Sequence, residues 1–250
     1  MSHAVLTQEG EVATVCLARG KVNALNDEVV RDLNGIFHDL ENDDGVRAVV
    51  LTGSGKFFSF GFDIPEFLSY GKASFTNYLK GFTKFCTYLF LFPKPVVAAL
   101  NGHTVAGGCM LTLACDHRIM VEAKAKMALN EIGFGASVFA GSVEMLRYCV
   151  GSKNAEDILF SGKMYSAAEA LQLGLIDEVA PAEQLAGEAA RVAREYAGKD
   201  LRAFASIKNL LRKPVVEGFA GREAKSVREF VDIWYSESTW KNLELIKIEK

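Results

Sequence analysis

Two glycine-rich segments of the 250-residue sequence carry residue types that could hold a developing negative charge. The first covers residues 56–64 (KFFSFGFDI) and the second covers residues 101–110 (NGHTVAGGCM). Glycine at the end of a strand allows a sharp turn and lets a ligand approach the main chain closely. A helix that begins near Gly108 leaves the amides of its first turn unpaired, and such amides attract negative charge. If the two segments converge, they form an oxyanion hole; taken singly, each is explained equally well by turns alone.

These segments need strands that end beside them. Residues 48–51 (AVVL) and 95–100 (PVVAAL) are short apolar runs, which are typical of strands covered on both faces. Residues 118–121 predict another buried strand, and residues 12–17 predict a strand at the start of the chain. The strands at residues 48–51 and 95–100 therefore end shortly before the two glycine-rich segments begin.

Helices are predicted between and after the strands, at residues 27–40, 108–114, 181–211 and 217–235. Asn26 is placed to cap the first of them, and residues 166–169 (SAAE) form a capping-box pattern. Pro214 is the expected break between the last two helices, and residues 175–179 predict a short strand. The alternation of strands and helices predicts an α/β fold with helices against a largely parallel sheet.

The composition argues against several other classes of protein. A net charge of −3 with mixed signs argues against a nucleic-acid surface. Because no apolar stretch is long enough to span a membrane and the N-terminus has no signal-peptide pattern, we expect neither feature. The five cysteines and four histidines lack metal-ligand spacing. We therefore expect reduced thiols, no metal and a reducing, cytoplasmic compartment.

Two familiar catalytic motifs are incomplete. Residues 53–56 (GSGK) invite interpretation as a phosphate loop, but Phe57 follows the lysine and Val50 stands where that motif has its first glycine. No Gly-x-Ser-x-Gly elbow occurs, so an α/β-hydrolase nucleophile is not expected.

Taken together and in this order, the two glycine-rich segments resemble the crotonase (enoyl-CoA hydratase/isomerase) superfamily. The resemblance runs from Val12 to Val179 and includes several short matches. These are residues 23–25 (NAL), 58–63 (FSFGFD), 101–108 (NGHTVAGG), 115–119 (CDHRI), 129–131 (LNE) and 173–177 (LGLID). The resemblance implies a crotonase-type spiral of repeated ββα units in residues 1–195. It also implies a C-terminal helical region, residues 196–250, that serves oligomerisation and covers the active site.

The resemblance also implies the substrate and the residues that bind it. The substrate would be an acyl-CoA thioester, and because coenzyme A is part of it, no separate cofactor is expected. The amides of Phe62 and Gly107 would be the two oxyanion donors, each typically worth about 10²–10³ in rate. The residues expected to contact the coenzyme A portion are Lys21, Val22, Asn23, Lys56 and Phe60. A homotrimer or a hexamer is the expected assembly.

The residues at the two catalytic glutamate positions limit which reaction of the superfamily is expected. Hydratases of the superfamily use two glutamates; here Met110 stands at the first position, while Glu131 is retained at the second. This pattern is similar to the Δ3,Δ2-enoyl-CoA isomerases, in which one glutamate removes a proton from C2 and the proton returns at C4 without water. Leu129, Ile132 and Phe134 flank Glu131, and desolvation by such neighbours would raise its pKa.

Other interpretations stay open at this point. Glu131 could be an ordinary surface or helix-capping carboxylate. The chain could hydrate, decarboxylate or isomerise a different CoA thioester, bind acyl-CoA without catalysis, or serve only as an assembly module. Residues 133–139 (GFGASVF) replace the proline and glycine pair usual in hydratases, so the acyl chain length is not predicted. Five phenylalanines are expected mainly to pack in the core, with one or two touching substrate: Phe67, Phe75, Phe82, Phe85 and Phe90.

Overall fold

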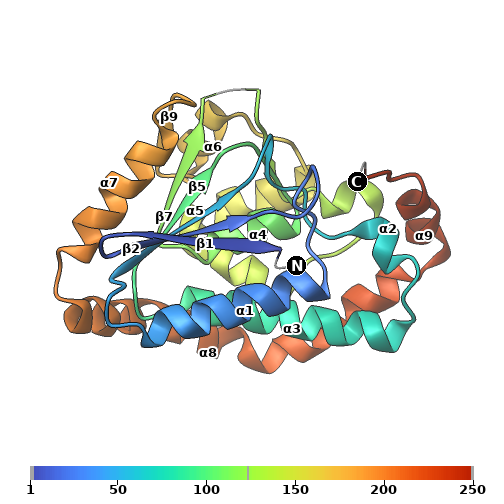
Figure 1. Cartoon of the computed structure of the whole chain (residues 1–250). Coiled ribbons are helices and arrows are strands. Elements are labelled where there is room, and N and C mark those ends of the chain that lie inside the picture. The colour runs from blue at the N-terminus through green and yellow to red at the C-terminus, as the bar shows by residue number, and fades with distance from the viewer. Residues whose placement is uncertain (1–2, 123, 249–250) are drawn as a thin grey trace.

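Two sheets form the framework of the molecule (Figure 1). Within residues 3–122 and 124–248, which the computed structural model describes, one sheet has six strands in the order β1-β2-β3-β5-β7-β9 and the other has three in the order β4-β6-β8. The strands of the large sheet are β1 (Ala4–Glu9), β2 (Val12–Leu17), β3 (Ala48–Gly53), β5 (Val96–Leu100), β7 (His117–Val121) and β9 (Glu178–Ala180). Only β1 and β2 pair antiparallel among these described strands. The predicted α/β fold with a largely parallel sheet is confirmed.

The small sheet was not predicted from the sequence. Its strands are β4 (Phe57–Ser59), β6 (His103–Val105) and β8 (Met127–Ala128), and both of its pairs are parallel. Strands of two or three residues are too short to show an alternating pattern. Each follows a strand of the large sheet and precedes a helix, so that β3-β4, β5-β6 and β7-β8 begin three successive ββα units.

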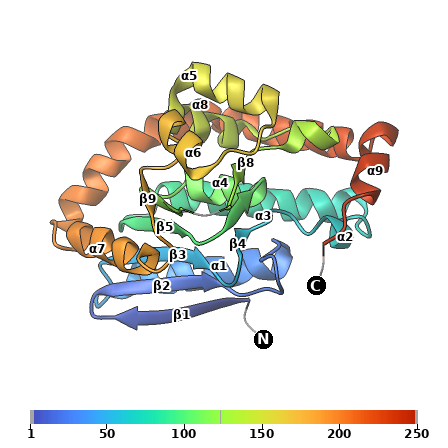
Figure 2. The same cartoon turned by 90° about the horizontal axis from the view of Figure 1, so that it is seen from above.

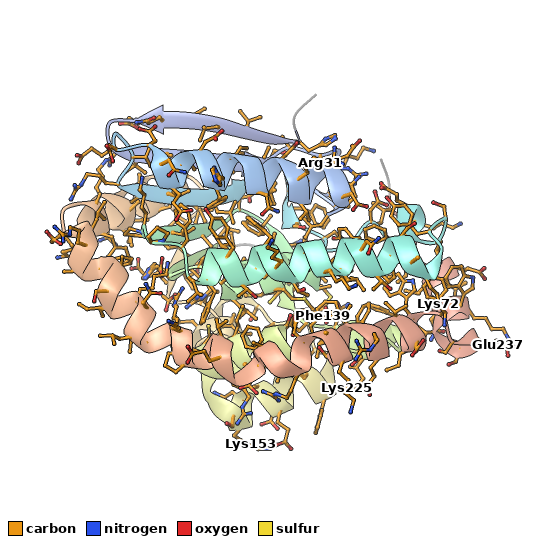
Figure 3. All side chains as sticks on the ribbon, turned by 90° about the horizontal axis from the view of Figure 1, so that it is seen from below. Arg31, Lys72, Phe139, Lys153, Lys225 and Glu237 are labelled. Atoms are coloured by element: carbon orange, nitrogen blue, oxygen red, sulfur yellow. The ribbon has the colours of Figure 1, made fainter. Side chains whose placement is uncertain are left out.

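Helices cover the two sheets. They are α1 (Asp27–Asn42), α2 (Ile64–Phe67), α3 (Lys72–Phe90), α4 (Gly107–Leu113), the 3₁₀-helix η1 (Glu131–Phe134), α5 (Ala140–Ser161), α6 (Ala167–Leu173), α7 (Leu185–Ala197), α8 (Leu201–Trp234) and α9 (Glu237–Glu244). α1, α3 and α8 lie side by side across one face (Figure 3). α7 packs against β3, β5 and β7 on the opposite side of the molecule from α9 (Figure 2). In the described part of the chain, no helix is both long enough and apolar enough to cross a membrane.

Both predicted capping patterns are confirmed. The Asn26 side chain accepts a hydrogen bond from the Val29 amide at 3.1 Å and starts α1. Ser166 and Glu169 form the reciprocal capping box that starts α6. Each cap satisfies amides that the first helical turn leaves unpaired.

The predicted boundaries of the two C-terminal helices are wrong. The chain breaks after α7, at Gly198, and Asp200 then caps α8 with its side chain. α8 continues through Pro214, although proline removes one helical hydrogen bond. Arg212 and Phe219 are both buried, so the helix is held in the core on either side of the proline. Tertiary packing therefore outweighs the local cost of Pro214.

Two other boundaries differ from the sequence interpretation. The last strand of the large sheet begins at Glu178, three residues later than predicted. The expected division between core and C-terminal region, at residues 195/196, falls in the last turn of α7.

A buried ion cluster anchors α8 to the sheet. Lys208 Nζ lies 2.8 Å from Asp116 Oδ2, and Arg212 Nη2 lies 3.1 Å from Asp116 Oδ1. The Val96 amide at the start of β5 donates to the same carboxylate at 2.7 Å. Arg212 also donates to three backbone carbonyls. The polar atoms of the cluster are therefore well satisfied, as burial of charge requires.

Asp116→Asn should destabilise the protein by about 3–5 kcal/mol, because Lys208 and Arg212 would remain buried without their counter-charge. Asp157→Asn is the control, since it breaks only the exposed pair with Lys153 and should cost less than about 0.5 kcal/mol. Urea unfolding gives the free energy of unfolding of each variant. Equal costs for the two variants would contradict an anchoring role for Asp116.

Candidate active site

Three loops meet at one edge of the small sheet. Phe62 lies three residues beyond β4, Gly107 two residues beyond β6, and Glu131 three residues beyond β8. Because β4, β6 and β8 are parallel, their carboxyl ends lie along the same edge. The short sheet thus brings together the three segments that carry the predicted catalytic groups.

The first two loops touch through glycine. Gly61 has a φ of +94°, and a Cβ there would lie 2.9 Å from the Val105 carbonyl oxygen and 3.1 Å from the Gly107 nitrogen. A Cβ on Gly107 would lie 2.8 Å from the Phe62 ring. The two backbones approach this closely because neither position carries a side chain. The convergence that the sequence left open is therefore present.

Both predicted oxyanion donors lie outside the local hydrogen-bond pattern. The Leu25 amide donates to the Gly61 carbonyl at 2.7 Å, and the Asp63 amide donates to the Leu25 carbonyl at 2.9 Å. Within the described residues, the Phe62 amide between them takes no part in this pairing. Gly107 is the first residue of α4, where amides have no acceptor within the helix. Both amides are available to an acceptor from outside the protein.

Backbone strain is stored beside the Gly107 amide. Ala106 has a φ of +49° and a ψ of −121°, a conformation that costs a residue with a side chain about 1–3 kcal/mol. Two hydrogen bonds hold it there: its amide donates to the Ala128 carbonyl at 2.8 Å, and its carbonyl accepts from the Met110 amide at 3.0 Å. β8 and α4 together therefore fix the orientation of the peptide that ends in the Gly107 nitrogen.

The Glu131 carboxyl is buried and unpaired. Glu131 is 4% exposed, and neither carboxyl oxygen has a hydrogen-bond partner among the described residues. Burial raises its pKa from 4.5 to about 8, since the ionised form loses its hydration. A carboxyl with such a pKa can both take and release a proton near neutral pH. The interpretation of Glu131 as a surface carboxylate is therefore wrong.

Glu131 lines a small, mainly apolar cavity of about 210 Å³. The lining residues are Phe60, Phe62, Ile64, Val105, Ala106, Asn130, Glu131, Phe134, Phe230, Trp234 and Ile246. Among these described residues, Glu131 has the one titratable side chain. Any proton transfer inside this cavity by a protein side chain must therefore use Glu131.

A larger cavity of about 630 Å³ adjoins the first through Phe60, which lines both. The other lining residues are Gly20, Lys21, Val22, Ser54, Gly55, Lys56, Phe57, Lys247 and Ile248. Four of the five residues predicted to contact coenzyme A are thus on this wall. The cavity combines lysine ammonium groups with apolar surface, which suits a ligand that has phosphates and an uncharged arm.

Asn23, the fifth of these residues, does not line the cavity. It is 1% exposed, and its side-chain amide donates to the carbonyls of Ser54 at 3.0 Å and Phe57 at 2.9 Å. Its φ is +50°, a conformation that asparagine tolerates better than most residues. The structure places Asn23 behind the cavity wall, where it ties the two loops together.

A third cavity, of about 470 Å³, lies on the other side of Glu131, which lines both. Its wall is formed by Leu129, Glu131, Ile132, Gly135, Ala136, Ser137, Val138, Val143, Leu159, Phe160 and Ile233. Glu131 is therefore a residue shared by the walls of two mainly apolar spaces.

Sequence reasoning expected the C-terminal region to cover the site but named none of its residues. Phe230, Trp234 and Ile246 line the small cavity, and Lys247 and Ile248 line the larger one. No local pattern marks these residues, because only tertiary folding brings them to the site. The five phenylalanines considered above are all buried in the core, and none of them lines these three cavities.

Met110, at the position predicted to match the first hydratase glutamate, is buried in α4. It is not among the described residues that line the small cavity. Its thioether therefore supplies no acid or base to that space.

The sequence profile of the enoyl-CoA hydratase/isomerase family matches residues 7–236. The chain belongs to the enoyl-CoA hydratase/isomerase family. Similar members include both hydratases and isomerases. The chain is 33% identical to a short-chain-enoyl-CoA hydratase of Clostridium acetobutylicum over 197 residues, which are 78% of this chain and 75% of that protein. It is 30% identical to the mitochondrial enoyl-CoA delta isomerase 1 of Mus musculus over 236 residues, 94% of this chain and 82% of that protein.

The crystal structure of human mitochondrial delta3-delta2-enoyl-CoA isomerase has the same fold. It matches with a TM-score of 0.90 at 27% identity, and the match covers 97% of this chain and 96% of that one. The predicted crotonase-type fold with a helical C-terminal region is confirmed. As a member of this enoyl-CoA hydratase/isomerase family, the chain is an enzyme of CoA thioesters.

Gly61→Ala should lower kcat/KM by about 10² or more, because the new Cβ would push the Phe62 and Gly107 amides apart. Gly10→Ala is the matched control: Gly10 also has a positive φ, of +59°, but nothing lies within 4 Å of a Cβ there. Both variants should lose some stability from backbone strain. Steady-state kinetics on a CoA thioester substrate measures the difference; full activity in Gly61→Ala would contradict the role assigned to this contact.

Glu131 should also make stability depend on pH. The pKa of Glu131 is about 8 in the folded protein and ordinarily 4.5, so folding favours its protonated form. Its contribution to the free energy of unfolding is therefore fully present below about pH 4.5 and is lost as pH rises through 8. The slope is at most about 1.4 kcal/mol per pH unit. Glu131→Gln removes this dependence, so the variant should gain stability relative to wild type from about pH 5 to about pH 8. Urea unfolding of both proteins at both pH values tests this; a constant difference would contradict a raised pKa.

Proposed function

We propose that this protein is an enoyl-CoA isomerase that shifts the double bond of a 3-enoyl-CoA to the 2-trans position. The observation that carries the proposal is the presence of a single titratable side chain, Glu131, among the described residues of the small cavity. Hydration needs a second group to position and activate water. A double-bond shift needs only one group, which moves one proton between two carbons.

The reaction uses the groups at the edge of the small sheet. The Phe62 and Gly107 amides donate hydrogen bonds to the thioester oxygen. Ionised Glu131 removes a proton from C2, and the electron pair delocalises over C2 to C4 and onto that oxygen. Protonated Glu131 then delivers the proton to C4, and the double bond forms between C2 and C3. The proton lost from C2 equals the proton gained at C4, so no water is consumed.

The raised pKa of Glu131 suits both half-reactions. A carboxylate in bulk water is too weak a base for a carbon-bound proton, and burial makes it stronger by destabilising its charge. The surrounding wall of Phe62, Phe134 and Phe230 limits water, which protects the dienolate from side reactions.

The larger cavity is the proposed site for coenzyme A. Lys21 and Lys56 supply positive charge for its phosphates, while Val22 and Phe60 supply apolar contact. Asn23 contributes by holding the loops in place. Lys247, from the other end of the chain, adds a further ammonium group to this wall.

The C-terminal helical region is proposed to cover the site and to serve assembly. Phe230 and Trp234 of α8 form part of the small cavity, which supports the covering role. Earlier in the same helix, Ile207, Leu210 and Leu211 are more than half exposed. Apolar side chains grouped in this way favour association, in line with the expected homotrimer or hexamer.

Hydration of a 2-enoyl-CoA is the second candidate, because several similar proteins are named as hydratases. The two candidates differ in substrate and in their need for water. Faster hydration of a 2-enoyl-CoA than isomerisation of the matching 3-enoyl-CoA would favour the second candidate.

Glu131→Gln should lower the rate of 3-enoyl-CoA isomerisation by at least about 10²–10⁴, since the amide cannot accept the proton. Binding of a saturated acyl-CoA, measured by calorimetry, should persist. Glu178→Gln is the control, because it removes a carboxylate that pairs with His117 and Arg191 away from the cavity. Retained turnover in Glu131→Gln would exclude the proposed mechanism, and absence of acyl-CoA binding by wild type would favour a role in assembly alone.

A further inference from the structure

Unpaired polar atoms gather around the small cavity. Five buried side-chain atoms lack a hydrogen-bond partner among the described residues, and four of them belong to Asn130, Glu131 and Trp234. All three residues line the cavity of about 210 Å³. Proton transfer accounts for the two carboxyl oxygens of Glu131. It does not account for Nε1 of Trp234 or Oδ1 of Asn130.

Trp234 is held rigidly in the cavity wall. It is 1% exposed, and its ring centroid lies 4.7 Å from that of Phe75 and 5.7 Å from that of Phe230. This packing on α3 and α8 leaves the indole little freedom to turn its N–H toward another acceptor. An unpaired buried donor destabilises a folded protein, and most buried polar atoms therefore find partners. A donor on a cavity wall is satisfied when a ligand brings the acceptor.

The two unpaired atoms complement each other. An indole N–H can only donate a hydrogen bond, whereas the oxygen of the Asn130 amide can only accept one. A hydroxyl group does both, since it has one proton and two lone pairs. The thioester oxygen is already assigned to the Phe62 and Gly107 amides. Coenzyme A is assigned to the larger cavity, which neither Trp234 nor Asn130 lines, so we place this hydroxyl on the acyl group, beyond the atoms that react.

We propose that Trp234 and Asn130 form a polar subsite that selects acyl-CoA substrates with a hydroxyl group on the acyl chain beyond the double bond. This inference rests on the proposed function for the position of the reacting carbons. Trp234 donates to the hydroxyl oxygen and Asn130 accepts its proton. An unsubstituted chain enters the same cavity but leaves both protein atoms unpaired. The two residues thus determine specificity and take no part in proton transfer.

The test compares 3-hexenoyl-CoA with its 5-hydroxy and 6-hydroxy derivatives. Wild type should show a kcat/KM about tenfold higher for at least one hydroxylated substrate than for the plain one. The reason is that the hydroxyl pairs the buried indole N–H, which the plain chain leaves without an acceptor. Trp234→Phe keeps an aromatic ring and removes the N–H, so this ratio should fall to about one. Phe230→Leu is the control: it alters the same wall without removing a polar atom, and the ratio should stay near the wild-type value.

Calorimetry with hexanoyl-CoA and its 5-hydroxy and 6-hydroxy derivatives measures the preference without turnover. The preference is then the ratio of the dissociation constants of the plain and the hydroxylated ligands. A binding preference lost in Trp234→Phe would support the subsite even if isomerisation were absent, so the two proposals fail separately. Asn130→Leu, which removes the acceptor, provides a second variant should Trp234→Phe not fold. The proposal is overturned if wild type binds all three ligands equally, or if both variants keep the preference.

Discussion

Backbone hydrogen bonds between β4, β6 and β8 place three loops at one edge of a very short parallel sheet, and the geometry of the candidate site depends on this alignment. A parallel pair keeps the carboxyl ends of its strands together, so the chain must leave every strand at the same place. The large sheet supplies the strand before each of these, and a helix follows each loop. The loops that carry Phe62, Gly107 and Glu131 meet for this reason, although almost seventy residues of sequence separate the first from the last.

The site concentrates several features that cost stability. Ala106 is strained, Glu131 is a buried carboxyl without a partner, and Trp234 and Asn130 leave polar atoms unpaired. The surrounding core tolerates them because it is dense in aromatic contacts, such as those that Phe62 makes with Tyr78 and Phe82. Sites that bind and react are commonly less stable than the frame that holds them. Here the cost is confined to one cavity wall.

The sequence predicted the parts of the fold that local chemistry controls. Buried strands such as β3 and β5 have clear apolar runs, and Asn26 and Ser166 begin helices through side chains close in sequence. The glycine-rich segments predicted the approach of Gly61 to Gly107, because only glycine permits such contact. The small sheet was missed because strands of two or three residues are too short to show the alternating pattern of apolar and polar residues. The path of α8 through Pro214 was missed because distant contacts hold the helix, and the place of Lys247 depends on the folded C-terminal end.

α8 joins two parts of the molecule that have different tasks. Leu210, on its exposed stretch, and Trp234, on the cavity wall, are 24 residues apart, or about 36 Å along a helix. Lys208 and Arg212 fix the first half of this helix to Asp116, and Phe230 and Trp234 are buried at its other end. One continuous helix therefore carries both the exposed apolar surface and part of the chamber wall. A truncation that removed the outer surface by deleting α8 would also open the chamber.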